Sequence, residues 1–391
     1  MKGLFFDASA TMLAKNLLPI GNVFCERLPD FKALFVSAEI SSNVNPILNK
    51  DSYNKIVSNK KYSFIRKRSF NARKIENFLT QYNPDFIFIG AYRIYDQLWT
   101  GIAKKKGIKV YKIQHGFEVE SVYYKPFTIL SKAIKSVRLI YAAYNLAIIS
   151  GTTPLRLINQ YQKYIIKGIS LKDTLLNNKL FHPTLSFVYS EYYKDFWNKK
   201  FGFDKDHMSI ITPQDFLLIK KVSEKPKEDA CCYITQTIVE DGRMKKKDFV
   251  RMLEEYVEIA KSVKKFIIKL HPRANIKYYD AFERLDNVEI TRDFPNCTYY
   301  LTHYSSMIFT AAFFSENLII HETKGNPTPD LFKIVASHIV TKPSEILTII
   351  KENANKPVPS LNERKEFLKD YAFFEDKNPY EKIFEEIIKQ F

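Results

Sequence analysis

The stretch FIIKLHPRANI (266–276) joins an apolar run to an abrupt polar stop. A short apolar run rich in isoleucine and bounded by polar residues is typical of a buried β-strand. It ends at His271, Pro272 and Arg273, where proline restricts the turn and the two cation-capable side chains can meet an anion. The stretch therefore predicts a strand of an open α/β sheet with an anion or proton-transfer site at its carboxyl end.

Apolar runs alternate with amphipathic segments on both sides of this stretch. RKIENFLTQYN (73–83) and DQLWTGIAKKK (96–106) have helical periodicity, and the second ends in lysines, which suit a helix C-terminus. Strands that alternate with helices predict doubly wound parallel sheets, an α/β fold. The expected strands are GLFFDAS (3–9), KALFVSAEI (32–40), DFIFIGAY (85–92), IKVYKIQHG (108–116), TLSFVYS (184–190), HMSIITP (207–213), CCYITQT (231–237), NVEITR (287–292), CTYYLTH (297–303) and NLIIHET (317–323).

A chain of 391 residues exceeds one ordinary core, so two domains are expected. IKKVSEKPKEDA (219–230) has the composition of a linker between them. Two doubly wound, Rossmann-like domains facing each other across a cleft resemble the glycosyltransferase-B (GT-B) architecture. The predicted division is an N-terminal acceptor-binding domain over 1–218 with a basic helical insert at about 123–180, the linker over 219–230, a C-terminal nucleotide-sugar donor-binding domain over 231–374 and a closing C-terminal helix over 375–391.

The net charge of +17 belongs to the first half of the chain. Residues 1–225 hold 35 Lys and Arg against 17 Asp and Glu, whereas residues 226–391 hold 25 against 26. The first half is therefore expected to face something anionic: a phospholipid surface, an acidic polymer or nucleic acid. Nucleic acid is disfavoured, because no RNP, KH or helix-turn-helix signature accompanies the charge.

Cysteine usage and apolar windows indicate a cytoplasmic protein. The four cysteines show no CxxC spacing, so we expect reduced thiols and no zinc site. The N-terminus fits a first strand better than a signal peptide. The longest apolar window, Leu139–Ser150, is shorter than the roughly 20 residues that span a bilayer.

Two serines follow the predicted strand CTYYLTH. Ser305 and Ser306 lie where the next helix should begin, and serine is a favoured N-cap, so part of this signal is structural. Two hydroxyls beside free backbone N–H groups also form a phosphate cradle. About one strand–helix–strand unit separates His271 from Ser305, so we expect both motifs at one edge of the same sheet. A capped strand with surface charges is the alternative interpretation.

Polar residues end two further strands. Thr235 and Gln236 end the first strand of the donor domain, which is a weak signal because polar residues often end strands. In IQHGFEVES (113–121), His115 precedes a glycine that permits close approach of backbone or substrate. A neutral imidazole suits general-base work near pH 7, and Glu118 is an alternative base. A structural loop histidine is the other interpretation.

These motifs together resemble the bacterial capsule and lipooligosaccharide sialyltransferases, particularly the polysialyltransferases. IIKLHPR (267–273) and LTHYSSMIF (301–309) match the His-Pro and Ser-rich motifs in order and spacing, and YITQT (233–237) is similar to the segment that opens the donor domain. That family has two acids and a glycine where this chain has Gln114-His115-Gly116. In its His-Gly motif and in YSS the chain resembles the CDP-glycerol glycerophosphotransferases of teichoic acid synthesis.

The resemblance implies a role for each matching residue. His271 contacts the donor phosphate and stabilises it as it leaves, and His115 becomes the base, with Glu118 in reserve. No metal ligand and no cofactor is expected, since the nucleotide sugar, CMP-linked in this family, is a co-substrate. The donor- and phosphate-binding candidates are Thr235, Gln236, Lys269, Pro272, Arg273, Ser305 and Ser306.

The predicted function is that of an inverting, metal-independent glycosyltransferase. It would use a CMP-activated nonulosonic acid, a sialic-acid-like donor, to extend a bacterial capsule or lipooligosaccharide glycan, as polysialyltransferases do. A CDP-polyol phosphotransferase, or another capsule- or teichoic-type polymerase of the same fold, is the alternative. A basic nucleic-acid-binding protein is an alternative from another class.

The basic insert predicts the surface that meets the acceptor or the membrane. Its cations are interleaved with apolar residues, a pattern suited to anionic headgroups or to an acidic or lipid-linked glycan acceptor. This places the protein in the cytoplasm, peripheral at the inner membrane. A packed helix pair with an ordinary core is the alternative. The residues concerned are Lys125, Lys132, Lys135 and Arg138.

Overall fold

The computed structural model describes most of the chain and divides it into two compact units. Unit 1 comprises Met1–His115, Tyr123–Gln214 and Lys369–Phe391, and unit 2 comprises Gly116–Val122 and Asp215–Leu368. The described residues are 1–37, 54, 62–66, 71–118, 129–167, 178–240, 243–271, 274–325, 327–352, 360–375 and 377–391.

Unit 1 is built on a seven-stranded sheet of order β3-β2-β1-β4-β5-β6-β7, with every pair of neighbouring strands parallel. Its strands are β1 (Lys2–Asp7), β2 (Lys32–Ser37), β3 (Tyr62–Arg66), β4 (Phe86–Ile89), β5 (Lys109–Ile113), β6 (Leu185–Val188) and β7 (Met208–Ile210). Its helical segments are α1 (Ala10–Met12), the π-helical η1 (Leu13–Leu17), α2 (Leu18–Arg27), α4 (Ala72–Tyr82), α5 (Ile94–Lys105), α6 (Ile129–Ser150), α7 (Pro154–Lys167), η3 (Lys179–Phe181), α8 (Glu191–Phe201), η4 (Lys205–His207) and α15 (Pro379–Ile388).

Unit 2 has a six-stranded parallel sheet of order β10-β9-β8-β11-β12-β13. Its strands are β8 (Glu228–Ile234), β9 (Phe266–Lys269), β10 (Val288–Thr291), β11 (Cys297–Thr302), β12 (Asn317–His321) and β13 (His338–Val340). Its helical segments are α9 (Leu217–Ser223), α10 (Lys246–Lys261), η6 (Ile276–Arg284), α11 (Met307–Ala311), α12 (Asp330–Val335), α13 (Pro343–Glu352) and α14 (Leu361–Leu368), while η5 (Gln214–Phe216) lies at the junction with unit 1.

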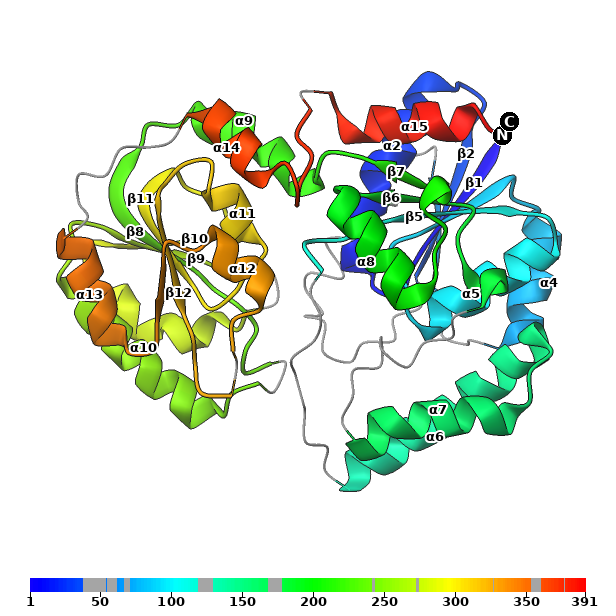
Figure 1. Ribbon diagram of the computed structural model, residues 1–391, viewed down its shortest axis with the longest axis horizontal. Helices are drawn as coiled ribbons and strands as arrows, with labels where there is room; N and C mark the ends of the chain where they lie inside the picture. Colours follow the sequence, from blue (N-terminus) through cyan, green and yellow to red (C-terminus); the bar gives the residue numbers. More distant parts are fainter. Residues whose placement is uncertain are drawn as a thin grey trace. The chain divides into compact units, whose positions relative to one another are not determined.

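Successive side chains of β1 pack on opposite faces of the sheet of unit 1. Phe5 stacks on Phe35 of β2 and Phe88 of β4, with ring centroids 5.0 and 6.2 Å apart. Phe6 points to the other face and stacks on Trp99 of α5 at 4.7 Å. Aromatic pairs of this kind each contribute about 0.5–1.5 kcal/mol beyond the area they bury. Helices cover both faces as a result (Figure 1).

Helices α6 and α7 form a hairpin that extends from unit 1 (Figure 1). The turn between them passes through Gly151, whose φ of 67° lies in the left-handed region that favours glycine. Pro154 then opens α7, because a proline is tolerated in the first helical turn. The segment SGTTP (150–154) thus divides the helical insert into two antiparallel helices.

The predicted α/β class, with two doubly wound parallel sheets, is confirmed. The pattern missed β3 and β13, two short strands at sheet edges. Residues 219–230, expected as a linker, contain the end of α9 and the start of β8. The C-terminal helix α15 packs on α2 of unit 1, where Phe24 meets Phe384 edge to face at 4.9 Å. Among the described helices, none is long and apolar enough to cross a bilayer.

Candidate functional site

The carboxyl ends of three neighbouring strands of unit 2 carry the predicted donor-site residues. His271 follows β9, and Ser305 and Ser306 follow β11. These two strands lie on either side of β8, which ends at Ile234 and is followed by Thr235 and Gln236. Because all three strands are parallel, the motifs meet at one edge of the sheet, although 34 residues separate His271 from Ser305.

Thr235 ties the end of β8 to the His271 loop. Its Oγ1 accepts a hydrogen bond from the backbone N–H of His271 at 2.7 Å, and the side chain also bonds Tyr279. Thr235 is buried, whereas His271 is half-buried. The Thr235 hydroxyl therefore positions the loop that carries His271. Direct contact of Thr235 with a nucleotide stays a prediction.

Gln236 ties the end of β8 to the loop that carries the serines. Its side-chain amide donates to the carbonyl of Tyr304 at 2.8 Å and accepts from the N–H of Tyr304 at 3.1 Å. These two hydrogen bonds resemble those between paired β-strands. They hold the backbone that leads into Ser305 and Ser306. Both serines are half-buried, and Ser305 Oγ accepts from the N–H of Met307 at 3.3 Å. The Ser305 hydroxyl is therefore partly occupied by the first N–H of α11, whereas Ser306, the N-cap residue, makes no side-chain cap hydrogen bond.

The helix that follows the serines is short. Helix α11 has five residues, so the aligned peptide dipoles that favour an anion at a helix start are few. Charge on a phosphate here would have to be met by hydroxyls, backbone N–H groups and nearby cations. Arg243 supplies one such cation, since its Nη1 donates to the Tyr304 hydroxyl at 2.7 Å and its guanidinium lies 5.4 Å from the ring centroid.

Arg243 was not among the residues predicted from the sequence. It lies in EDGRM (240–244), before α10, and no hydrophobic periodicity marks it. Its place beside the serine loop depends on a contact between residues 61 positions apart. The only available signal was a lone arginine after a predicted strand end.

The His-Gly motif reaches the serine loop through its glycine. Gly116 has φ 66°, and a Cβ built on it would lie 3.8 Å from Ser306 Oγ. The next residue, Phe117, stacks on Phe309 of α11 with ring centroids 3.8 Å apart and is buried. The start of this loop therefore belongs to unit 2 and packs on the helix after the serines.

His115 is positioned from unit 1 by its neighbour Gln114. The backbone N–H of Gln114 donates to Phe187 at 2.8 Å, while Tyr189 donates its hydroxyl to the Gln114 carbonyl at 2.9 Å. The Gln114 side chain, fully buried, accepts from the Tyr189 N–H. His115 and Glu118 are both half-buried, so each has a solvent-facing part that a substrate hydroxyl could reach.

Several predicted residues lie outside what the structure describes. Lys269 ends β9 and is half-buried. Pro272, Arg273 and Lys125 lie outside the described residues. The remaining insert cations lie in α6, but their side chains are not among those described, so their role stays a prediction: Lys132, Lys135 and Arg138. Among the described residues, no three His, Cys, Asp or Glu side chains group as metal ligands do.

A second histidine at this sheet edge is buried and neutral. His303 follows β11 directly, its Nε2 lies 2.9 Å from the Tyr233 hydroxyl, and its Nδ1 lies 3.0 Å from the His321 carbonyl. The carbonyl can only accept, so Nδ1 carries the proton and Nε2 accepts from Tyr233. Burial lowers the pKa of His303 to about 3 and also lowers the pKa of His321, which meets the Tyr256 hydroxyl at 2.7 Å.

This buried histidine pair predicts acid sensitivity of unit 2. Both folded-state pKa values lie below the usual value of about 6.5, so only the unfolded chain takes up these protons as the pH falls. Stability is complete above about pH 6.5 and is lost progressively below it; His303 alone should cost about 2 kcal/mol at pH 5. Urea unfolding of unit 2 at pH 7 and pH 5 measures the loss.

A matched pair of variants tests the assignment. His303→Gln should flatten the pH dependence of unfolding, whereas His207→Gln, at an exposed histidine of unit 1, should leave it intact. Equal stability of the parent at pH 7 and pH 5 would contradict the buried neutral state of His303.

An ion cluster at the strand ends of unit 1 was also missed. Asp7 ends β1 and faces Arg93 at 3.3 Å, and Arg93 Nε donates to Asp96 Oδ2 at 2.7 Å. Burial raises the pKa of Asp7 against the opposing effect of the Arg93 guanidinium. A Cβ at Gly90 would collide with the Asp7 carboxylate, so only glycine fits there. The usable signal was the acid that ends the strand GLFFDAS.

Comparison with known proteins addresses the fold. No protein-family model matches the chain, and no curated protein matches it. Among solved structures, S. aureus MnaA with UDP has a TM-score of 0.56 at 10% identity, covering 100% of this chain and 96% of that chain. The fold is GT-B.

Two further solved structures are similar to this chain over their whole length or most of it. The Methanocaldococcus jannaschii UDP-GlcNAc 2-epimerase in complex with UDP-GlcNAc and UDP has a TM-score of 0.54 at 13% identity, with 100% of both chains covered. The wall teichoic acid polymerase TagF with CDPG has a TM-score of 0.55 at 11% identity, covering 100% of this chain and 88% of that chain. At these identities the similarity establishes the fold, and the GT-B prediction is confirmed.

Proposed function

We propose that this protein is a transferase whose unit 2 binds a cytidine-nucleotide donor at the carboxyl ends of β8, β9 and β11. One observation carries the proposal: Thr235 and Gln236, adjacent in sequence, tie the His271 loop and the serine loop to the same strand end. In open parallel sheets this is the edge where ligands bind. The His271 imidazole, the serine hydroxyls and the Arg243 guanidinium are then available at this edge as groups that could bind one phosphate.

The reaction proposed is a single displacement. The acceptor hydroxyl attacks the anomeric carbon of the donor sugar, its proton passes to His115, and the bond to the nucleotide phosphate breaks. His271 and the serine hydroxyls stabilise the negative charge that develops on the departing nucleotide. Glu118 is the alternative base. No metal is needed in this scheme, because protein donors take the charge of the leaving group.

The donor proposed first is a CMP-activated nonulosonic acid, transferred to a bacterial surface glycan. Support comes from the order and spacing of IIKLHPR and LTHYSSMIF, in which His271 and Ser305 lie at one sheet edge. The acceptor would be an acidic or lipid-linked glycan, in keeping with the basic balance of residues 1–225.

A CDP-polyol phosphotransferase is the second candidate, and the placement of Gly116 favours it. The His-Gly motif distinguishes this chain from the sialyltransferase pattern, and its glycine lies beside Ser306. TagF, a GT-B neighbour at 11% identity, was solved with CDPG. In this alternative the acceptor hydroxyl attacks phosphorus, CMP leaves, and the same residues would act as base and phosphate ligands.

Nucleotide-dependent thermal stabilisation tests the proposal. CMP, CDP, UDP and GDP are compared at equal concentration, and a ligand present at 100 times its Kd adds about 2.7 kcal/mol. We expect cytidine nucleotides to raise the melting temperature and the Ser305→Ala, Ser306→Ala double variant to lose the shift. Stabilisation by UDP alone would point to UDP-sugar chemistry and contradict the proposed donor.

A donor panel separates the two candidates. The protein is incubated with CMP- and CDP-activated donors and mixed glycan acceptors, and mass spectrometry follows nucleotide release and acceptor mass. Release of CMP from a CMP-nonulosonic acid supports the first candidate. Release of CMP from a CDP-polyol, with polyol phosphate added to the acceptor, supports the second.

A further inference from the structure

Helix α6 of unit 1 exposes a continuous apolar stripe. Its members are between 45% and 68% exposed and form a set spaced three or four residues apart. At 100° per residue they fall within an arc of about 100° on the helix. We call these residues the α6 stripe: Val137, Ile140, Tyr141, Tyr144 and Ile148.

The opposite face of α6 accounts for the packing of the helix. Leu139, Ala142, Ala143 and Leu146 are buried, and α6 packs on α4, α5 and α7. The helix is therefore apolar on two opposite faces, although only the buried face packs against the rest of unit 1. No described residue covers the α6 stripe, and Leu155 at the start of α7 is likewise exposed, at 71%. A contiguous apolar surface of this kind marks an interaction site.

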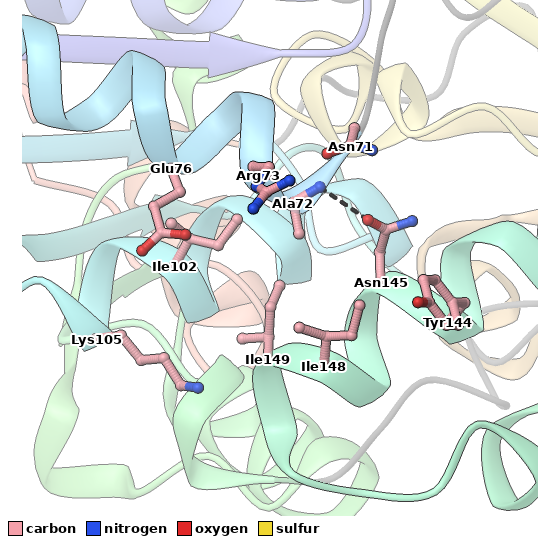
Figure 2. A pocket seen from close by; sticks show the side chains of 10 residues that line it. All are labelled: Asn71, Ala72, Arg73, Glu76, Ile102, Lys105, Tyr144, Asn145, Ile148 and Ile149. Atoms are coloured by element: carbon pink, nitrogen blue, oxygen red, sulfur yellow. Dashed lines mark hydrogen bonds between the residues drawn. The ribbon is translucent and has the colours of Figure 1, made fainter.

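The α6 stripe runs into a pocket of about 370 Å³ between α4, α5 and α6. Tyr144 and Ile148 line one side, and Arg73 and Lys105 reach it from α4 and α5 (Figure 2). Two cations, Arg73 and Lys105, and one acid, Glu76, line the pocket, so its charge is positive. The Glu76 carboxylate also lies 4.0 Å from the Lys106 ammonium, which offsets its negative charge. An apolar wall beside two cations is suited to an amphiphile with an anionic head.

The charge of the α6–α7 hairpin indicates which kind of partner binds the α6 stripe. Residues 129–167, which span α6, the turn and α7, contain no Asp or Glu and six Lys and Arg residues. A second copy of this chain would bring two such hairpins together and oppose twelve cations with no acid. An anionic surface instead complements the charge, and the stripe supplies the apolar contact.

We infer that the α6 stripe lies in the interface of a bilayer rich in anionic phospholipid, with the pocket beside it receiving a headgroup phosphate. Aliphatic side chains such as Ile140 and Ile148 enter the acyl boundary, while the hydroxyls of Tyr141 and Tyr144 stay at headgroup level. Arg73 and Lys105 meet the phosphate of a lipid at the rim. The inference goes beyond the proposed function and holds whichever donor is used.

Vesicle co-sedimentation tests the stripe. The full chain is spun with vesicles of phosphatidylcholine alone or with phosphatidylglycerol added. The variant Ile140→Ser, Tyr144→Ser, Ile148→Ser should lower the partition onto anionic vesicles at least tenfold, on the order expected for lost apolar burial. The control variant Leu217→Ser, Ile334→Ser, Ile339→Ser removes three exposed apolar side chains of unit 2 and should bind like the parent.

The pocket cations have their own test. Arg73→Ser with Lys105→Ser should lower partition onto anionic vesicles about tenfold and leave cytidine-nucleotide stabilisation unchanged. Lys220→Ser with Lys221→Ser removes two exposed cations of unit 2 and should change little. Binding of the parent should weaken with salt, because exposed charges are screened within about 8 Å at physiological ionic strength.

A fluorescence readout makes the test independent of expression levels. The two native tryptophans, Trp99 and Trp197, are buried, so Tyr144→Trp introduces a single exposed reporter. Its emission should shift to the blue with anionic vesicles. No shift, equal sedimentation of the stripe variant and the parent, or a parent dimer that the stripe variant converts to monomers without any vesicle binding would each overturn the inference.

Discussion

Replacing His271 with alanine is expected to lower turnover at least ~100-fold, equivalent to about 2.7 kcal/mol of transition-state stabilisation. The imidazole lies after β9, on a backbone held by Thr235 at 2.7 Å, at the edge where Ser305 and Ser306 also lie. Negative charge develops on the donor phosphate as it leaves, and a preorganised donor acts on that charge more strongly than on the ground state. Initial rates of nucleotide release at saturating donor measure the effect.

Neighbouring variants separate chemistry from binding. Ser305→Ala with Ser306→Ala should chiefly weaken nucleotide binding, because the proposed site has those hydroxyls contact the phosphate in the ground state as well. Thr235→Val keeps the volume but removes the acceptor for the His271 N–H, and should give an intermediate rate with nearly unchanged nucleotide affinity. Should His271→Ala and the double serine variant both keep near-native rates, the phosphate site lies elsewhere.

Replacing His115 with alanine is expected to nearly abolish transfer while leaving nucleotide affinity unchanged. His115 belongs to unit 1, whereas the proposed phosphate ligands belong to unit 2, so losing the imidazole should remove the proposed proton acceptor and no donor contact. General-base catalysis typically supplies 10²–10⁴-fold in rate, so a loss of about that size is expected. Single-turnover rates together with cytidine-nucleotide thermal shifts measure the two parts separately.

Glu118→Gln is the matched control, since Glu118 is half-buried three residues further along the same loop. It should retain most activity if His115 is the base. A dead Glu118→Gln variant beside an active His115→Ala variant would move the base to the carboxylate. Acceptor analogues with a more acidic hydroxyl should partly rescue whichever variant lacks the true base, because they need less help in losing the proton.

The order of strands and helices could be predicted from the sequence because it depends on the local pattern of apolar and polar residues. A run such as FIIKL is apolar at consecutive positions because both faces of a parallel strand are buried. The same reasoning found the strand ends at His271, Thr235 and His115. It missed β3 and β13, because short edge strands bury less surface and carry a weaker pattern.

Three histidines show where sequence reasoning stops. His115, His271 and His303 all follow strands, and the sequence distinguishes the first two only by the glycine and the proline that come after them. Only the third lies under other elements, where Tyr233 and the His321 carbonyl take both ring nitrogens and burial lowers its pKa to about 3. Burial is set by what packs on top of a residue, which the strand itself does not encode.

The sequence by itself determined the fold class and the residue types available at each strand end, because hydrophobic period and turn chemistry act over a few residues. Tertiary structure alone decided which of those residues work together. Thr235 meets the His271 backbone across 36 positions, Gln236 meets Tyr304 across 68, and Arg243 joins the same loop across 61. It also decided that the described residues cover one apolar face of α6 and leave the other exposed. Contacts between residues so far apart in sequence depend on strand order and packing, which are established only when the whole chain folds.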